Sequence, residues 1–291
     1  MKIKQSPGEL IFSGINIFIL SVFSLACILP FINIVASSFS SSHSITMHPF
    51  MLWPRDLDLS GYWFIFSSEA LVRSVWVSIY VTVLGTIISM SATALTAYPL
   101  SRKQLAARGF ILKMIVFTMM FSGGMIPTFL VVRATGLLDS IWALIIPSMI
   151  GPFNLIIMKN FYMQIPVELE ESAKMDGGND FWIFLRIYTP LAVPVIATLS
   201  LFYAVGYWNG FMSVLLYIRN HRLWTIQIIL RNIMHSVTAL TTEGAFDTDF
   251  VLPTKTVRYG TAVVATVPIL LVYSFAQKHF VKGVMIGSIK G

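Results

Sequence analysis

The chain has 291 residues, of which 56% are apolar and only 11% are charged, and its mean hydropathy is +0.77. A soluble domain carries about 25% charged residues because its surface must be solvated, so this composition excludes both a water-soluble globular protein and a disordered chain. The formal net charge is +7, but no basic run accompanies it, which argues against nucleic-acid binding. The composition therefore predicts an integral membrane protein.

Six apolar stretches are long enough to cross a bilayer, which requires about 20 mainly apolar residues. The predicted spans are 11–35, 74–98, 110–132, 141–162, 190–217 and 259–280. Glycines and prolines interrupt the third and fourth spans at Gly123, Gly124, Pro127, Pro147 and Pro152. Backbone breaks at membrane depth need protein or a water-lined cavity around them, so these residues either kink a packed bundle or take part in transport. The stretches predict an all-α membrane protein with one domain over residues 1–291.

The distribution of basic residues predicts the orientation of the chain. With the amino terminus in the cytoplasm, twelve Lys and Arg residues lie at or near the inner ends of the spans and eight lie outside. We therefore expect both termini on the cytoplasmic side, with 99–109 and 163–189 as inner loops. The outer loops 37–72 and 219–258 are either solvated connections or, for 37–72 with its Trp and Tyr residues, a segment at the membrane interface.

No sequence motif for catalysis, nucleotide binding or metal binding is present, such as a Walker A loop, a dinucleotide glycine fingerprint or a His-Glu-x-x-His helix. We therefore predict no catalytic, cofactor-binding or metal-binding residue and do not expect an enzyme. Carboxylates are also missing near the centres of the predicted spans, where ion-coupled carriers commonly place ionisable groups. If the chain transports a solute, its energy comes from a partner. A secondary carrier for a small solute is the alternative.

The inner loop 163–189 has the pattern of a short helix. Pro166 suits the first helical position, and Gly177 offers a left-handed stop. Three carboxylates that complement the helix dipole fall in the first turns, at Glu168, Glu170 and Glu171. Glu170 can also pair with Lys174 at i,i+4. The pattern predicts a helix of about ten residues, which is either a simple connection or, with the small Ala173, a docking element.

The same loop reads Glu171-Ser172-Ala173, then Asp176-Gly177, and later Pro190 and Pro194. This arrangement resembles the signature loop of ABC-importer permeases, which begins Glu-Ala-Ala, continues to Asp-Gly and closes with Leu-Pro. The chain departs from it at Ser172 for alanine and at Thr189 for leucine, and neither change alters charge or backbone shape. Further segments resemble maltose-type sugar permeases, namely Trp53-Pro54, 97–102, Trp208-Asn209 and 282–291. Two segments, 123–127 and 204–209, resemble more closely the subgroup that includes the permeases of alginate and complex-saccharide importers.

The resemblance implies a type I ABC-importer permease fold with six transmembrane helices in the bacterial inner membrane. It implies a second homologous permease, an extracytoplasmic solute-binding protein, and two ATPase subunits that bind ATP and Mg²⁺, so that no cofactor binds this chain. The predicted helix is then a cytoplasmic coupling helix that docks on the ATPase through Glu170, Glu171, Ser172, Ala173, Asp176 and Gly177. The tail is either disordered or a second ATPase contact through Gly283, Gly287, Lys290 and Gly291.

The fifth predicted span carries the candidates for contact with a saccharide, alginate-like or another complex sugar. Sugars are held by aromatic faces and convergent hydrogen bonds, which the span offers at Tyr203, Tyr207, Trp208, Asn209 and Phe211. The alternative is that these residues pack against other helices, with Gly206 and Gly210 at a helix–helix contact. An ABC permease for a non-sugar substrate is the alternative within the same family.

Overall fold

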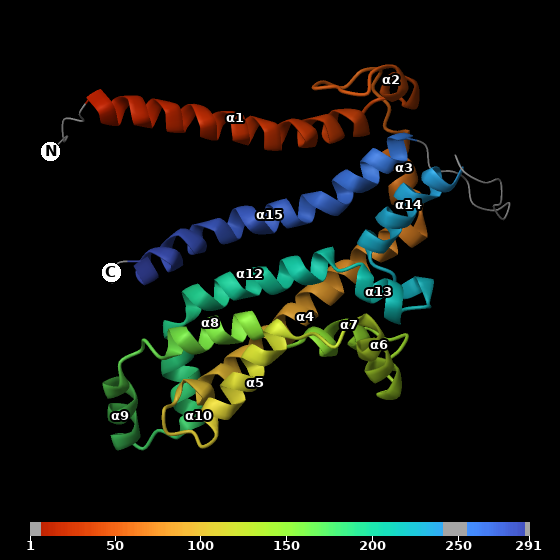
Figure 1. Cartoon of the computed structure of the whole chain (residues 1–291). Helices are drawn as coiled ribbons and strands as arrows, with labels where there is room; N and C mark the ends of the chain where they lie inside the picture. The colour runs from red at the N-terminus through yellow and green to blue at the C-terminus, as the bar shows by residue number, and fades with distance from the viewer. Residues whose placement is uncertain (1–6, 241–254, 289–291) are drawn as a thin grey trace. The chain divides into compact units, whose positions relative to one another are not determined.

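The structure is a computed structural model that describes residues 7–240 and 255–288 (Figure 1). Over these residues the chain is helical, with turns and one isolated β-bridge between Ser40 and Leu57, which confirms the all-α fold. The chain divides into two compact units. The first comprises residues 1–69 and 230–266, and the second comprises residues 70–229 and 267–291.

Three helices are individually long and apolar enough to cross a membrane: α1 (Pro7–Ser38), α4 (Glu69–Ser101) and α15 (Lys255–Ser288). Side chains along most of α1 are exposed, as expected of a helix in contact with lipid. Three further candidates are bent helix pairs, so that the described residues contain up to six spans if each pair counts as one. Inserting the chain in lipid therefore depends on how the breaks within these pairs are accommodated.

The bent pairs occupy the stretches that the sequence predicts as the third, fourth and fifth spans. α5 (Arg108–Met120) and α6 (Met125–Ala134) meet at 120°, and α7 (Trp142–Ile145) with η1 (Ile146–Ser148) meets α8 (Pro152–Tyr162) at 53°. The third bend, of 82°, separates α10 (Asp180–Ile183), η2 (Phe184–Tyr188) and α11 (Thr189–Leu191) from α12 (Val193–Asn209). Gly124 at φ +87° and the prolines at the other two breaks explain why the helices stop there.

The fifth predicted span, 190–217, differs most from the observed helices. α12 ends at Asn209, Gly210 is extended, and a separate short helix α13 follows (Met212–Tyr217). The sequence continues through η3 (His221–Leu223) into α14 (Ile226–Leu240). Residues 241–254 of the predicted outer loop lie outside the described residues.

In the first unit, the predicted loop 37–72 contains two short helices, α2 (Ser42–Met47) and α3 (Ser60–Ser67). Thr256 at the start of α15 holds this region together, because its hydroxyl lies 3.0 Å from the Ser42 hydroxyl and its side chain fills the space beside Gly61. Trp53 and Trp63 are exposed. The loop is therefore a folded segment with outward-facing tryptophans.

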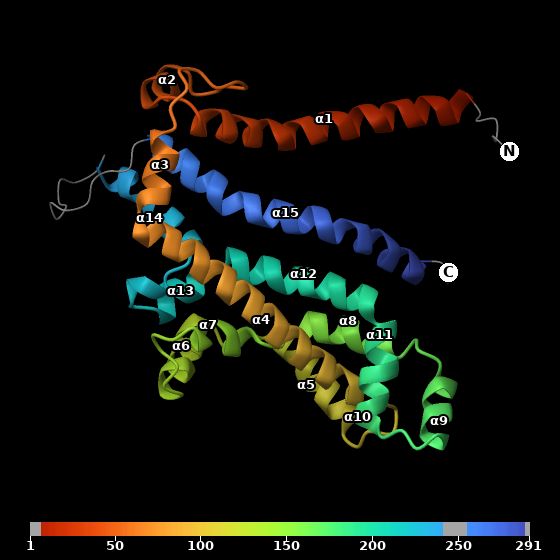
Figure 2. The ribbon, with the colours of Figure 1, turned by 180° about the vertical axis from the view of Figure 1, so that it is seen from behind.

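In the second unit, α4, α8 and α12 build the core that positions the candidate sites (Figure 2). Its buried apolar residues include Ala97 and Leu100 of α4, Met158 of α8, and Leu199 of α12. In both ribbon views, α9 (Val167–Met175) stands at the end of this unit where α8 ends and α10 begins. The core thus connects a short polar helix to the apolar helices.

Candidate functional site

The short helix α9 (Val167–Met175) forms where the sequence predicts it, with its start one residue later than expected. Pro166 is the N-cap, with φ −56° and ψ 133°, and is followed by the acidic first turn. Gly177 has φ +84°, the left-handed conformation that favours glycine, which confirms the predicted stop. The Nζ atom of Lys174 lies 2.8 Å from a carboxylate oxygen of Glu170, which confirms the predicted i,i+4 ion pair.

The helix has one face directed into the second unit and one exposed face. Glu170 and Ala173 are buried, at 6% and 7% exposure. The remaining predicted docking residues are exposed, with Glu171 and Ser172 on the helix and Asp176 and Gly177 directly after it. Of the six residues predicted as one docking surface, two therefore attach the helix to the rest of the chain, and four are accessible to another molecule.

The buried face of α9 is attached through an arginine at the end of α4. The Arg102 guanidinium forms an ion pair with Glu170 and donates a hydrogen bond to the Tyr188 hydroxyl at 2.9 Å. It lies 4.5 Å from the ring centroids of both Tyr98 and Tyr188, a cation–π distance. We call Tyr98, Arg102, Tyr162, Glu170 and Tyr188 the arginine clamp.

The clamp joins four elements at one point. Tyr98 is on α4, Tyr162 on α8, Glu170 on α9 and Tyr188 on η2. The Tyr162 ring meets Tyr98 and Tyr188 edge to face, at centroid distances of 6.3 and 5.5 Å. Most of these side chains are nearly inaccessible, so the ion pair is partly desolvated and stronger than a surface pair. A displacement of α9 is therefore resisted by three other elements.

Sequence reasoning did not find the clamp. Arg102 and Tyr188 are 86 residues apart, and no local pattern connects them. The one available indication was Arg102 itself, a charged residue directly after a long apolar helix whose last residues include Tyr98. Its position fits an inner-loop arginine equally well, so the sequence alone could not assign it to Glu170.

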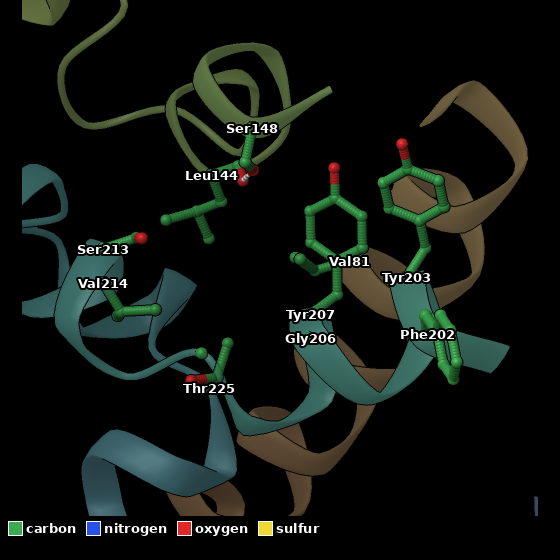
Figure 3. Close-up of a pocket in the computed structure, with 11 residues that line it drawn as sticks. Val81, Leu144, Ser148, Phe202, Tyr203, Gly206, Tyr207, Ser213, Val214 and Thr225 are labelled. Carbon is green, nitrogen blue, oxygen red and sulfur yellow. Dashed lines mark hydrogen bonds between the residues drawn. The ribbon is translucent and has the colours of Figure 1, made fainter. Parts of the chain in front are cut away.

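A second candidate site is a pocket of about 260 Å³ beside α12 (Figure 3). It is lined by residues of α4, α7, η1, α12 and α13 and by Thr225, all in the second unit. None of the lining residues is charged, and they combine apolar side chains with hydroxyl groups: Val81, Leu144, Ser148, Phe202, Tyr203, Gly206, Tyr207, Gly210, Ser213, Val214 and Thr225.

Two predicted substrate-pathway residues, Tyr203 and Tyr207, line this pocket, but their hydroxyls are engaged within the chain. The Tyr203 hydroxyl lies 2.7 Å from that of Thr93 and accepts a hydrogen bond from the Gly151 N–H at 2.9 Å. The Tyr207 hydroxyl lies 2.7 Å from that of Ser89. The bond from Gly151 pairs a backbone N–H at the break before α8, as a break at membrane depth requires. The tyrosines present their rings, rather than free hydroxyls, to the pocket.

The other predicted pathway residues lie outside the pocket lining. Trp208 is buried at 4% exposure, Asn209 is exposed at the end of α12, and Phe211 is half-buried. Among the described residues of this chain, a Cβ atom placed on Gly206 meets nothing within 4 Å, so the alternative helix–helix contact at this residue is not made within that part of the chain. The close approach is instead at Gly85 of α4, where a Cβ atom would lie 2.8 Å from the Tyr207 ring.

The predicted tail contact falls partly outside the described chain. Gly283 and Gly287 lie within α15, which continues to Ser288. Lys290 and Gly291 are outside the described residues. The glycines therefore continue a helix, which differs from the expected irregular tail.

Comparisons with known proteins identify relatives along nearly the whole chain. Residues 104–286 match the family model "Binding-protein-dependent transport system inner membrane component". The chain is 49% identical over 273 residues to the polygalacturonan/rhamnogalacturonan transport system permease protein YtcP of Bacillus subtilis, covering 94% of this chain and 96% of that one. It is 46% identical to protein LplC of the same organism, covering 97% and 95% of the two chains.

A solved structure shares the fold. It is described as a bacterial ABC transporter involved in the import of the acidic polysaccharide alginate. Its matching chain has a TM-score of 0.85 and 31% identity, with 96% of this chain and 100% of that chain covered.

Proposed function

The chain belongs to the family of binding-protein-dependent transport system inner membrane components, and from this premise we propose that it is the permease subunit of an importer for complex oligosaccharides. The observation that carries the substrate class is the 49% identity over 94% of the chain to a polygalacturonan/rhamnogalacturonan permease. The alginate importer with the same fold supports a saccharide of this kind, including acidic ones.

In this proposal the permease is one component of an assembly in the bacterial inner membrane. A second, homologous permease completes the transmembrane pathway, and an extracytoplasmic binding protein delivers the saccharide. Two ATPase subunits bind ATP and Mg²⁺ on the cytoplasmic side, where both termini of this chain also lie. The chain itself binds no cofactor and catalyses no reaction. One permease domain, with six spans that include the three bent pairs, carries out alternating access.

The exposed face of α9 is the proposed docking surface for an ATPase subunit. Glu171 and Asp176 supply two carboxylates to that surface. Ser172 and Gly177 are small, so that the ATPase subunit can approach the backbone closely. Glu170 and Ala173 act from the opposite side by fixing α9 on the chain. Movement of the ATPases then reaches the spans through the arginine clamp. The helical end of α15, with Gly283 and Gly287, together with Lys290 and Gly291, is a proposed second contact.

The proposal is tested by reconstituting this chain in vesicles with its second permease, ATPase and binding protein. We expect ATP-dependent accumulation of galacturonan or rhamnogalacturonan oligosaccharides, and no accumulation when the non-hydrolysable ATP analogue replaces ATP. A matched preparation without the binding protein serves as the control. Accumulation that persists without ATP, or follows a proton or sodium gradient, would contradict an ATP-driven importer.

A further inference from the structure

We propose that Arg108 and Lys159 bind the phosphate group of an anionic phospholipid of the surrounding membrane. The two residues lie where the ends of three helices meet, and neither belongs to the arginine clamp, the exposed face of α9 or the pocket beside α12. The inference goes beyond the proposed function, because it concerns the lipid around the permease and does not depend on which solute is carried.

The Arg108 side chain connects the end of α4 to the end of α8. Arg108 is the first residue of α5, and its Nε atom donates a hydrogen bond to the Leu100 carbonyl in the last turn of α4 at 2.8 Å. One of its Nη atoms lies 3.3 Å from the sulfur of Met163, directly after α8. Lys159 lies four residues before Met163, and therefore on the same face of α8. Its charge is close enough to that of Arg108 for the two to repel each other, beside the contact between α5 and α8.

The positive charge of this pair is not neutralised among the described residues. Both side chains are half-buried, and neither has a described carboxylate within ion-pair distance, since the ion pairs around α9 involve Arg102 and Lys174. The ends of α4 and α8 contribute about −0.5 charge each and the start of α5 about +0.5, so a net charge of about +1.5 remains. An anion between the two cations removes their repulsion. A phosphodiester carries one negative charge and several acceptor oxygens, which suits a guanidinium beside an ammonium group.

The surroundings of the pair favour a lipid headgroup over a free phosphate ion. α5 and α8 belong to two of the bent pairs that count as spans, so the start of α5 and the end of α8 lie where these spans leave the membrane, on the cytoplasmic side in the proposed orientation. One turn into the membrane, Ile111 and Leu112 on α5 and Ile156 on α8 are all partly exposed. Acyl chains can therefore follow the same two helices whose ends hold the phosphate. Basic residues between spans at the cytoplasmic side bind anionic headgroups in this way.

Lys159→Gln is the decisive variant, because it removes one charge and leaves the bond from Arg108 to the Leu100 carbonyl in place. In neutral lipid the change also removes the repulsion from Arg108, so the variant should be at least as stable as the wild type. In anionic lipid the wild type should be the more stable of the two. This reversal distinguishes a lipid site from a general loss of folding. Lys103→Gln is the matched control, since Lys103 is an exposed residue of the same charge in the loop between α4 and α5.

The experiment titrates the delipidated complete transporter with phosphatidylglycerol, phosphatidylcholine or inorganic phosphate. Native mass spectrometry gives the apparent Kd of each lipid, and thermal unfolding gives the stabilisation by each of the three probes. A basic residue near the membrane surface contributes about a fivefold factor in affinity for an anionic lipid. Lys159→Gln should therefore raise the apparent Kd for phosphatidylglycerol about fivefold, and Arg108→Gln combined with it about 25-fold. Lys103→Gln should change this Kd by less than about twofold, because the residue does not touch the headgroup.

Several outcomes would overturn the assignment. Equal weakening by Lys103→Gln and Lys159→Gln would mean that binding follows total charge, and equal stabilisation by phosphatidylcholine would mean that the headgroup charge is not recognised. Stabilisation by inorganic phosphate alone would identify a soluble anion as the ligand. If another subunit covers the pair, Lys159→Gln should release that subunit and leave phosphatidylglycerol binding unchanged. These measurements do not involve uptake, so a failure here leaves ATP-driven import as proposed, and a failure of import leaves the lipid site testable.

Discussion

Replacing Arg102 by methionine tests whether the arginine clamp holds α9 on the chain. The Glu170 side chain is 9% exposed and that of Arg102 is 21% exposed, so the pair is largely shielded from water. Removing one partner of a buried pair costs about 3–5 kcal/mol. Lys174 remains 2.8 Å from Glu170 and compensates part of its charge, which places the expected cost near the lower limit. The two cation–π contacts of the same guanidinium are lost as well, so about 3 kcal/mol is the least that this substitution should cost.

Hydrogen–deuterium exchange of the α9 amides measures this cost locally. A loss of about 3 kcal/mol raises the population of the opened helix about a hundredfold, and exchange should accelerate by a similar factor while α12 keeps its rate. The same variant should consume ATP while transporting less saccharide per ATP hydrolysed, because a loosened α9 transmits less of the ATPase movement. A purely structural defect would lower both rates together.

A double-mutant cycle identifies the source of the effect. Glu170→Gln alone should also accelerate exchange, and its combination with Arg102→Met should cost less than the sum of the two single changes. Glu171→Gln is the matched control, since it lies on the exposed face of the same helix and should leave exchange unchanged in the absence of the ATPase. Equal exchange rates in Arg102→Met and the wild type, or additive effects in the cycle, would refute the clamp.

Further substitutions test the remaining geometry. Gly177→Asp should abolish coupled uptake while the protein stays in the membrane. The residue has φ +84°, which a side chain disfavours, and the added side chain also enlarges the exposed docking surface. ATP-driven uptake at the wild-type rate would contradict this prediction. Gly85→Ala should lower the thermal stability of the purified complex, since its Cβ atom would lie 2.8 Å from the Tyr207 ring and overpacking costs about 1–3 kcal/mol, whereas Gly206→Ala should not. Tyr203→Phe should cost about 1–3 kcal/mol by leaving the Gly151 N–H unpaired. Tyr162→Phe, whose hydroxyl has no partner among the described residues, should be neutral in the same thermal assay.

Local sequence patterns predicted α9 accurately because its determinants lie within the helix itself. The acidic first turn, the Glu170–Lys174 pair and the Gly177 stop act over one to four residues, and each is present. The position of the breaks could be inferred in part from glycines and prolines, but the bend angles could not. Those angles depend on which distant groups satisfy the backbone, such as the Tyr203 hydroxyl that accepts a hydrogen bond from Gly151.

The division of α9 into two faces also required the structure. Glu170 and Glu171 are neighbours with the same charge, and no pattern in the sequence distinguishes their roles. They point in different directions because successive helical residues are about 100° apart, and the contacts of Glu170 are what mark it as the attached side chain. Glu170 pairs with Arg102, and no sequence pattern near α9 indicates that this arginine lies beside it.

Helix α4 carries contacts to both candidate sites. Near its end, Tyr98 forms part of the arginine clamp, and further back Thr93 and Ser89 bond the hydroxyls of two tyrosines that line the pocket. A continuous helix between these points transmits displacement with little loss, so movement of α9 should alter the pocket wall. Such coupling means that the arginine clamp and the pocket bias one equilibrium. Gly206→Leu, in the pocket wall, should then also change the hydrogen–deuterium exchange of the α9 amides; exchange unchanged in that variant would mean that α4 positions the two sites independently.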